Sequence, residues 1–229
     1  MQKVYEGKTK EVYSLGKGLL LLRFKDTVTG EEGRIDPGAN QVIGEIEGKG
    51  QASFRASLYF FHLLQENGFP THFVASGEEE GYGPKSMIVK EARAHPLEVI
   101  CRRKAWGSFV RRYGRYISEG APLPYLVEFT LKDDERGDPF ITEEVLKILG
   151  IASEEAIQEM KEMARRVAVF LEEHLSNKGL ELLDLKLEFG EAEGKLVIID
   201  EISGDCMRVR KGGRLLLPHE LVLALEGKI

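Results

Sequence analysis

One segment of this sequence alternates strictly between apolar and charged residues. In residues 183–189, leucine or phenylalanine occupies every second position and charged residues lie between them. Because successive side chains of a β-strand point to opposite faces, this pattern predicts a strand with one apolar and one charged face. Residues 190–194 are typical of a turn, and 196–199 predict a second strand that is apolar on both faces. The charged face of the first strand is either solvent-exposed surface or the floor of a site.

The hydrophobic pattern of the rest of the chain predicts an α+β fold with two lobes. Residues 1–90 form the expected N-terminal antiparallel sheet lobe, and 91–229 a larger mixed α/β lobe. Further strands are predicted at 4–15, 18–26, 69–76, 85–92, 96–103 and 125–133, and short helices at 105–114 and 141–150. A hairpin turn is expected at 16–18, and a glycine-rich loop containing Asp36-Pro37-Gly38 at 27–50.

Two longer helices are marked by their capping residues. One is expected from Ser53, as N-cap, to Gly68. The other, the clearest helix of the chain, runs over 153–179 with Ser153 as its N-cap. Its buried stripe is expected to consist of Ile157, Met160, Ala164, Val167, Leu171 and Leu175.

Composition narrows the class of protein. Hydrophobic residues make up 42% and charged residues 31% of the sequence, as in soluble globular enzymes. The net charge of −6 argues against general affinity for nucleic acid, which requires a basic surface. Cys101 and Cys206 show neither metal-ligand spacing nor a disulfide framework, which favours reduced thiols in the cytoplasm. No signal peptide and no apolar run of about 20 residues is found, so we expect no membrane association.

Two basic segments are candidates for anion binding. In the first, Gly7 permits close approach of a ligand, and Lys8 and Lys10 on one strand face fit a polyphosphate; the alternative is a solvated edge strand. In the second, over 101–113, Arg102 precedes a helix that is predicted to begin at Ser108, which fits a phosphate or carboxylate. The alternatives there are arginines on an exposed helix face, or stacking of nucleic-acid bases on the aromatic residues.

The predicted hairpin at 183–200 combines acidic residues with a lysine. Its second strand has no polar face, so we expect the hairpin to lie centrally in its sheet. If Asp200 pairs with Lys186, both share a face with Asp184 and Glu188. Carboxylates beside a lysine can hold Mg²⁺ through oxygen ligands while the lysine neutralises a phosphate. The polar loop at 203–208 and the acidic loop at 132–139 are either turns or parts of such a site.

Ten short motifs, in their order along the chain, resemble the SAICAR synthetase family, the phosphoribosylaminoimidazole-succinocarboxamide synthases of purine biosynthesis. They are YEGKTKEVY, FKD, GKG, PTHFV, PLEVICR, GSFVRRYG, KDDERGDP, LGIA, LDLKLEFG and DEISGD. They span residues 4 to about 208, which is nearly the whole chain. LDLKLEFG followed by DEIS is highly specific.

The resemblance implies a two-lobe fold, with an N-terminal sheet like that of the kinase nucleotide lobe and ATP in the cleft. It implies a carbon–nitrogen ligase that joins L-aspartate to the carboxylate of CAIR, an imidazole ribonucleotide, and yields SAICAR, ADP and phosphate. A carboxylate is a poor electrophile until it is phosphorylated, after which the amine displaces the phosphate. The cofactors would be ATP and Mg²⁺, the location cytoplasmic, and the assembly a homo-oligomer, most often a dimer.

The resemblance also implies roles for individual residues. Those expected to bind ATP are Lys8, Lys10, Val12, Lys90, Glu188 and Asp200, of which Glu188 and Asp200 would also hold the metal. Those expected to bind substrate are Arg102, Ser108, Asp205 and Arg208. The expected catalytic residues are Lys186, Asp184 and Arg208. Asp134 and Asp138 match an acidic loop of the family whose role is left open.

The chain departs from the family pattern at several positions. They are Thr27 for an aspartate, Gly30 for an alanine, Ser53 and Arg103 for asparagines, Gly204 for a proline, and a C-terminal segment that differs and is short. Most of these concern the substrate side. Two alternatives therefore remain: a divergent paralogue that uses another amine or carboxylate, or a kinase-like phosphotransferase acting on a small molecule. Against the second, neither HRD nor DFG occurs. A nucleotide-binding regulatory module without turnover is a third interpretation.

Overall fold

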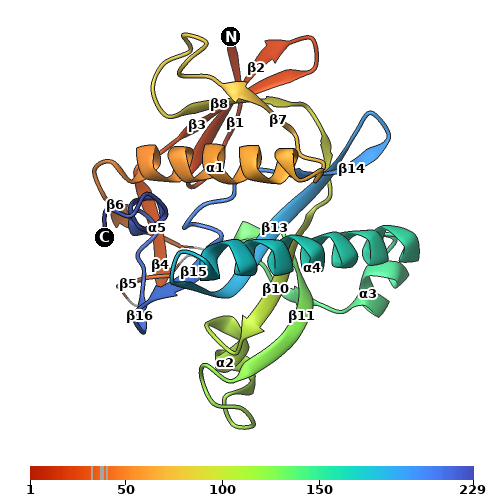
Figure 1. Cartoon of the computed structure of the whole chain (residues 1–229). Coiled ribbons are helices and arrows are strands. Elements are labelled where there is room, and N and C mark those ends of the chain that lie inside the picture. Colours follow the sequence, from red (N-terminus) through yellow and green to blue (C-terminus); the bar gives the residue numbers. More distant parts are fainter. Residues whose placement is uncertain (32, 37–38, 40) are drawn as a thin grey trace.

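The structure is a computed structural model that describes residues 1–31, 33–36, 39 and 41–229. Pro37 and Gly38 of the expected Asp36-Pro37-Gly38 segment lie outside the described residues. Two large antiparallel sheets dominate the fold, with the long helices α1 (Lys49–Glu66) and α4 (Glu154–Ser176) packed against them (Figure 1). No helix in the described ranges is both long and apolar enough to cross a membrane.

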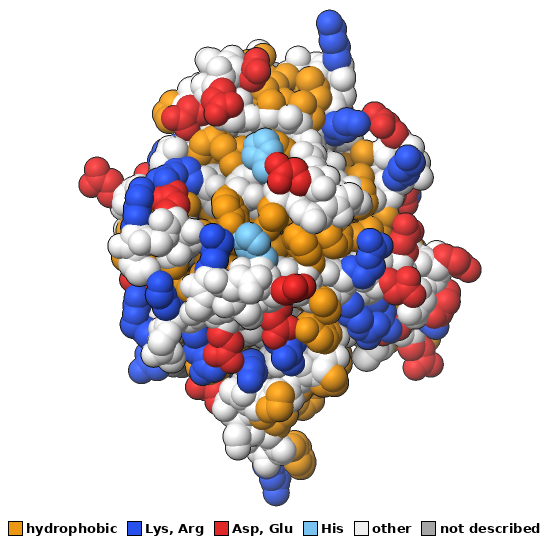
Figure 2. Space-filling view, viewed as in Figure 1, with side chains coloured by type: hydrophobic (Ala, Val, Ile, Leu, Met, Phe, Trp, Pro, Cys, Tyr) orange, Lys and Arg blue, Asp and Glu red, His pale blue; other side chains and the backbone are white. Residues whose placement is uncertain are grey.

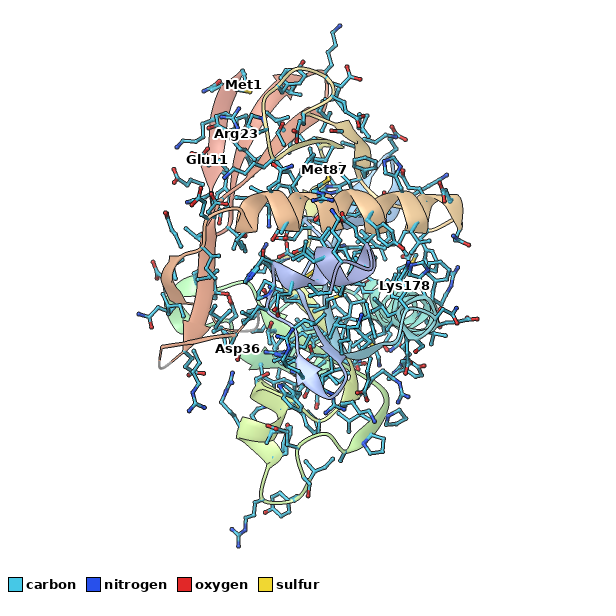
Figure 3. The ribbon with its side chains drawn as sticks, turned by 60° about the vertical axis from the view of Figure 1, so that its left-hand side comes forward. Met1, Glu11, Arg23, Asp36, Met87 and Lys178 are labelled. Atoms are coloured by element: carbon cyan, nitrogen blue, oxygen red, sulfur yellow. The ribbon has the colours of Figure 1, made fainter. Side chains whose placement is uncertain are left out.

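The first sheet is built from the N-terminal residues alone. Its strands, in spatial order, are β1 (Gln2–Glu6), β2 (Lys10–Gly16), β3 (Leu19–Phe24), β8 (Ser86–Lys90) and β7 (Phe73–Ser76). The predicted turn at 16–18 is confirmed, because β2 and β3 pair across Lys17. The single strand expected at 4–15 is wrong: residues 7–9 divide it into β1 and β2, so Lys8 does not share a strand face with Lys10. Helix α1 packs on this sheet, and Met87 of β8, labelled in Figure 3, is fully buried beside it.

The expectation of a loop over residues 27–50 is wrong. A three-stranded sheet of β5 (Arg34–Ile35), β4 (Thr27–Glu31) and β6 (Gln41–Glu45) occupies most of it. Its strands are short and polar, so they show little of the hydrophobic alternation on which the prediction relied. The N-cap prediction for Ser53 is also wrong: α1 is capped by Gly48, and Ser53 is buried inside the helix.

The second sheet has β13 (Leu180–Ala192) at its centre, as expected for a hairpin that lies centrally. The strands around it are β10 (Leu97–Lys104), β11 (Pro122–Leu131), β12 (Phe140–Ile141), β15 (Met207–Lys211), β16 (Arg214–Leu215), β14 (Lys195–Ile199) and β9 (Arg93–Ala94). The shorter helices are α2 (Ser108–Tyr113), α3 (Glu143–Ile148), α5 (Glu220–Leu225) and a 3₁₀ turn at Asp134–Arg136. The predicted strands and helices after residue 90 are thus confirmed.

Helix α4 closes one face of this second sheet and leaves the other face for the cavity described below. Every residue of its predicted stripe is buried, and Ser153 caps it by accepting a hydrogen bond from the Ala156 N–H. One continuous apolar core includes side chains of both sheets, of α1 and of α4. The division into domains at residue 90 therefore stays a prediction. Both cysteines are buried free thiols.

The predicted pairing of Asp200 with Lys186 is wrong. The hairpin turn consists of two residues, Glu193 and Gly194, both with positive φ. Because the turn is this short, Ala192 pairs with Lys195, and this pair sets the register between β13 and β14. The pairing ends with Glu188 opposite Ile199. Asp200 has left the strand, with a left-handed φ of 67°. This backbone turn, and not the strand register, brings its side chain to the same cavity as Glu188.

The surface mixes charges of both signs. On the face in Figure 2, Lys and Arg side chains are interspersed with Asp and Glu and form no continuous basic band. The two aromatic rings of the second basic segment, Trp106 and Tyr113, each have an arginine of the chain itself over them. Arg210 lies over Trp106 at 5.8 Å and Arg112 over Tyr113 at 5.2 Å, measured to the ring centroids.

Candidate active site

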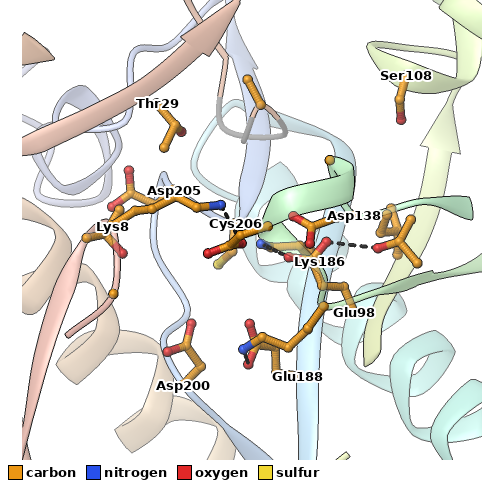
Figure 4. A pocket seen from close by; sticks show the side chains of 18 of the residues that line it. Lys8, Thr29, Glu98, Ser108, Asp138, Lys186, Glu188, Asp200, Asp205 and Cys206 are labelled. Carbon is orange, nitrogen blue, oxygen red and sulfur yellow. Dashed lines mark hydrogen bonds and ion pairs between the residues drawn. The ribbon is translucent and has the colours of Figure 1, made fainter. Parts of the chain in front are cut away.

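A cavity of about 570 Å³ lies between the N-terminal strands and the charged face of the second sheet. The β1–β2 turn and β4 form one wall, and β10, β11 and β13 form the floor. The predicted site residues that line it are Lys8, Lys10, Val12, Arg102, Ser108, Asp184, Lys186, Glu188, Asp200, Asp205 and Arg208. In Figure 4, Glu188 and Asp200 lie at one end of this cavity and Ser108 at the other.

Lys90 is the predicted site residue that does not line the cavity. It is the last residue of β8, and its ammonium group lies 3.1 Å from the Glu193 carboxylate at the surface. Its side chain is about half exposed. A place at the adenine end of a nucleotide stays a prediction for this residue and the backbone that follows it.

Strand register assembles the cavity floor. Arg102 of β10 lies opposite Asp184 of β13, and Ile100 opposite Lys186. On the other side of β13, Arg208 pairs with Asp184. Because alternate residues of neighbouring strands share a face, these side chains form rows across the sheet. Asp184 is only 2% exposed. The charged face of β13 is therefore the floor of a site and not solvent-exposed surface.

Two lysines of the β1–β2 turn region reach the cavity from the opposite wall. The Lys10 Nζ lies 3.2 Å from Asp200 Oδ1 and also contacts Glu201. Burial opposes the charge on Lys10, but these two carboxylates outweigh burial and hold the pKa of Lys10 above its ordinary value. The Lys8 Nζ lies 2.8 Å from Asp134 Oδ1. Lys10 is thus held as a cation at this end of the cavity, and the Lys8 side chain lies beside it.

Two carboxylates, the buried Glu188 and the partly exposed Asp200, repel each other beneath those lysines. Burial, and then the negative charge of Asp200, raise the pKa of Glu188 above its ordinary value. Burial also opposes ionisation of Asp200, but Lys10, Lys132 and Lys186 outweigh it and lower the pKa of Asp200. Lys132 Nζ lies 2.5 Å from Glu188 Oε2. A further cation at this position would relieve the repulsion between the two carboxylates.

Lys186 lies on the floor between the carboxylate pair and the arginines. Its Nζ is 2.5 Å from Glu98 Oε1, and Glu98 also accepts a hydrogen bond of 2.9 Å from the Thr130 hydroxyl. Burial disfavours the charged ammonium, but Glu98 and Glu188 hold the pKa of Lys186 above its ordinary value. The Lys186 ammonium is therefore charged and fixed in place.

Arginines and carboxylates alternate at the other end of the cavity. Arg102 donates to Glu128 at 2.6 Å, to Asp184 at 3.2 Å and to the Ser108 hydroxyl at 2.9 Å. Arg112 donates to the second oxygen of Glu128 at 2.6 Å. Because α2 has only six residues, these side chains, more than a helix dipole, make this end attractive to an anion.

The arginine end continues onto the N-terminal part of the chain through Asp36. Arg208 donates to Asp184 at 2.8 Å and also contacts Asp36. Arg111 lies 3.3 Å from the other carboxylate oxygen of Asp36. In Figure 3, Asp36 lies beside the C-terminal half of the chain, far from the sheet that carries Glu11 and Arg23. Asp36 thus joins the N-terminal part of the chain to Arg208 and Arg111 at this end.

Several residues of the cavity escaped the sequence analysis. Glu98 faces the same side of β10 as the predicted Arg102, Thr130 of β11 donates to Glu98, and Lys132, the residue just after β11, also lines the cavity. The two-residue alternation that marked β13 is therefore also present in these strands and could have identified them. Asp36 carried no comparable signal, because its contacts with Arg208 and Arg111 depend on tertiary structure alone.

Two of the departures from the family pattern leave the cavity floor intact. The Thr27 hydroxyl donates to the Lys8 carbonyl at 2.5 Å and so fixes the turn that carries Lys8. Arg103 points to the opposite face of the sheet, where its Nε lies 2.8 Å from Glu172 of α4. Neither Thr27 nor Arg103 lines the cavity.

The departure at Gly204 is coupled to the different C-terminal segment. A Cβ at Gly204 would lie 2.3 Å from the Pro218 carbonyl oxygen and 2.5 Å from its Cα. These are backbone atoms that cannot turn aside, so only glycine fits. Pro218 leads into α5, which packs on α1. The C-terminal segment therefore packs directly on the loop that carries Asp205.

Replacing Gly204 by alanine is expected to lower both stability and turnover. Overpacking of this kind costs about 1–3 kcal/mol of unfolding free energy, and displacement of the Asp205 loop by about 1 Å would lower kcat roughly 10- to 100-fold. Urea unfolding and steady-state kinetics measure the two effects. Gly44→Ala is the matched control, since a Cβ at Gly44 meets no atom within 4 Å. Equal behaviour of the two variants would contradict the prediction.

Comparison with known proteins agrees with this geometry. A family model described as SAICAR synthetase matches residues 3–214. The phosphoribosylaminoimidazole-succinocarboxamide synthase of Clostridium tetani is 48% identical over 225 residues, covering 96% of this chain and 97% of that protein. The enzyme of the same name from Thermotoga maritima is 41% identical over 212 residues, covering 92% of this chain and 86% of that protein.

A solved structure is similarly close. It is a SAICAR synthetase in complex with ADP, and it superposes with a TM-score of 0.83 at 34% identity, covering 98% of this chain and 91% of that one. The match extends over nearly the whole fold, including both sheets that enclose the cavity. The chain therefore belongs to the SAICAR synthetase family, which joins L-aspartate to the carboxylate of CAIR in purine biosynthesis.

Proposed function

We propose that this chain uses ATP to join L-aspartate to CAIR, with release of SAICAR, ADP and phosphate. One observation carries the proposal: a single cavity has a lysine and carboxylate end, an arginine end, and the fixed ammonium of Lys186 between them. The first end suits a polyphosphate and the second a phosphate monoester. The ADP complex of the related structure supports nucleotide binding in this fold.

The residues at the first end also fit Mg²⁺. Glu188 is buried, Asp200 is partly exposed, and both line this end of the cavity; burial and the negative charge of Asp200 raise the pKa of Glu188. Mg²⁺ in phosphoryl-transfer sites is held by one or two carboxylates together with phosphate oxygens and water. We therefore propose Glu188 and Asp200 as its protein ligands, where the ion would neutralise charge on the phosphates.

The side chains of the cavity account for the remaining requirements of the reaction. Lys8 and Lys10 hold the phosphate chain of the nucleotide, and Arg102, Ser108 and Arg208 hold the phosphate of CAIR. Lys186, between the two, stabilises negative charge on the phosphoryl group during its transfer to the CAIR carboxylate. The amine of aspartate then attacks the activated carbonyl carbon and phosphate leaves. Positioning and charge neutralisation thus supply most of the catalysis.

Turnover with each substrate omitted in turn tests the proposal. With ATP, Mg²⁺, CAIR and L-aspartate, the purified protein should form SAICAR and ADP in equal amounts. Leaving out aspartate should abolish ADP release in steady state. ADP formation from CAIR without an amine would instead identify a phosphotransferase. Tight ATP binding without ADP under any combination would identify a regulatory module, and turnover with another amine a divergent paralogue.

The cellular location and the oligomeric state are proposed from the cysteines and from the family resemblance. Both thiols are buried and unbridged, as in proteins of a reducing cytoplasm. We propose a cytoplasmic enzyme that forms a homodimer, as the family resemblance implies. Size-exclusion chromatography with light scattering measures the assembly directly.

A further inference from the structure

Lys49 is a buried lysine with no role in the function proposed above. It is the first residue of α1 and is 1% exposed. A cation at this position is unfavourable twice over, because burial removes it from water and the helix N-terminus is itself the positive end of the dipole. The first turn of α1 contains no acidic residue to compensate. Such a residue is poorly suited to stabilising the fold.

The two glycines around Lys49 explain how it is directed inward. Gly48 has a left-handed φ of 81° and caps the helix. A Cβ at Gly50 would lie 2.8 Å from the Lys25 carbonyl oxygen, so only glycine allows α1 to begin against that backbone. The Gly50 N–H donates to Asp26 at 2.7 Å. The GKG motif is therefore a device that places a lysine inside the protein at the start of α1.

Lys49 and Ser53, one helical turn apart, meet the same oxygen of Asp205. The Lys49 ammonium contacts Asp205 Oδ2, and the Ser53 hydroxyl donates to that oxygen at 2.8 Å. The main chain of Asp205 is held as well, because its N–H donates to the Ser203 hydroxyl at 3.0 Å. Ser203 in turn donates to Glu201, the partner of Lys10.

Asp205 itself lines the cavity between the two proposed substrate ends. Its loop runs from Glu201, at the nucleotide end, to Arg208, at the phosphate end. The bond between the amine and the activated carboxylate must form between these ends. A carboxylate there suits an ammonium or amine group as its ligand. Burial and Glu201 raise the pKa of Asp205, while Lys49 opposes them.

We propose that Lys49 is a positioning residue which, with Ser53, fixes Asp205 Oδ2 so that the other carboxylate oxygen receives the amine of L-aspartate. The inference rests on the proposed ligase function and deepens it, because it assigns the specificity for the amine substrate to a contact between α1 and the 201–206 loop. Lys49 does not line the cavity and acts through Asp205 alone.

The kinetic constants of two variants test the inference. Lys49→Met should raise the KM for L-aspartate about 10- to 100-fold, since a hydrogen bond or ion pair to a charged group is worth about 1.5–3 kcal/mol. Ser53→Ala, which removes one hydroxyl and keeps the charge pair, should raise it about tenfold. The KM values for ATP and CAIR should change less than twofold. Lys161→Met, which removes an ion-paired lysine of α4 outside the cavity, is the control.

A double-mutant cycle separates positioning from a general structural role. If Lys49 acts through Asp205, Lys49→Met should add less than twofold in an Asp205→Asn background. The inference would be overturned if the effects of Lys49→Met and Asp205→Asn on the KM for L-aspartate multiplied in the double variant. It would also be overturned if only the KM for CAIR rose, or if Lys49→Met and Ser53→Ala both left the KM for L-aspartate unchanged. Circular dichroism shows whether each variant folds. If Lys49→Met does not fold, the KM of Ser53→Ala for L-aspartate decides the test. Lack of turnover by the unmodified protein would refute the proposed function, whereas active variants with an unchanged KM for aspartate refute only the role of Lys49.

Discussion

Replacing Lys186 by methionine is expected to lower kcat about 100- to 1,000-fold. Methionine keeps the length and apolar stem of the side chain but removes the cation that Lys186 places between the carboxylate pair and the arginines. Loss of a single fixed group that stabilises developing charge typically has this magnitude. The KM for CAIR should change much less than kcat, because the proposed phosphate contacts of CAIR are made elsewhere. Steady-state kinetics with all three substrates measure both constants.

The control for this prediction is a lysine of the same hairpin. Lys195→Met removes an exposed ammonium at the start of β14, outside the cavity, and should leave kcat within twofold. Glu98 loses its partner in Lys186→Met, so the variant must also be checked by urea unfolding. A folded Lys186→Met protein with a kcat near that of the Lys195→Met control would show that Lys186 has no part in phosphoryl transfer.

Replacing Arg208 by glutamine is expected to raise the KM for CAIR about 100-fold. The guanidinium group is buried, donates to Asp184 at 2.8 Å and lies at the proposed phosphate end. Glutamine can still donate to Asp184, but it cannot offer a charged fork to a phosphate. Loss of about 3 kcal/mol of charged hydrogen bonding corresponds to this factor. The KM for ATP should stay within twofold, because Lys10 and its carboxylates lie at the other end.

Arg210→Gln is the matched control, two residues further along β15. As alternate residues of β15, Arg208 and Arg210 point to the same side of the sheet, but Arg210 does not line the cavity: it donates to Glu181 at 2.6 Å and lies over Trp106. This variant should bind CAIR normally. If Arg210→Gln and Arg208→Gln raise the KM for CAIR equally, Arg208 does not hold the phosphate of CAIR. A uniform rise of all three KM values would indicate disruption of the floor through Asp184 instead.

Much of the fold follows from local sequence pattern. The alternation in 183–189, the Ser153 cap of α4 and its apolar stripe each depend on neighbouring residues only, and each is confirmed. The other strands of the cavity floor were predicted at 96–103 and 125–133, and both are confirmed. Because alternate side chains share a face, the pattern also identified Asp184, Lys186 and Glu188 as one group before any contact was known.

Long-range contacts decided what the pattern could not. The sheet formed by residues 27–45 has strands too short and polar to show alternation, and it exists because β4 pairs with β5 and β6. The inward direction of Lys49 depends on close approach of Gly50 to the Lys25 backbone. The need for glycine at Gly204 depends on Pro218, which lies on a different segment. In the last two cases the contacting residues, Gly50 with Lys25 and Gly204 with Pro218, are not neighbours in sequence.

The charged face of β13 shows both contributions together. The sequence by itself determined that Asp184, Lys186 and Glu188 point one way, since this follows from strand geometry. It did not determine that the face is buried, nor that Asp200 joins it. The face is buried because the N-terminal strands lie across the cavity from it. Asp200 reaches the cavity because its own backbone is left-handed, directly after the last paired residue of β14, Ile199. Tertiary structure thus turned a charged strand into an active-site floor, because only distant segments can exclude water from it.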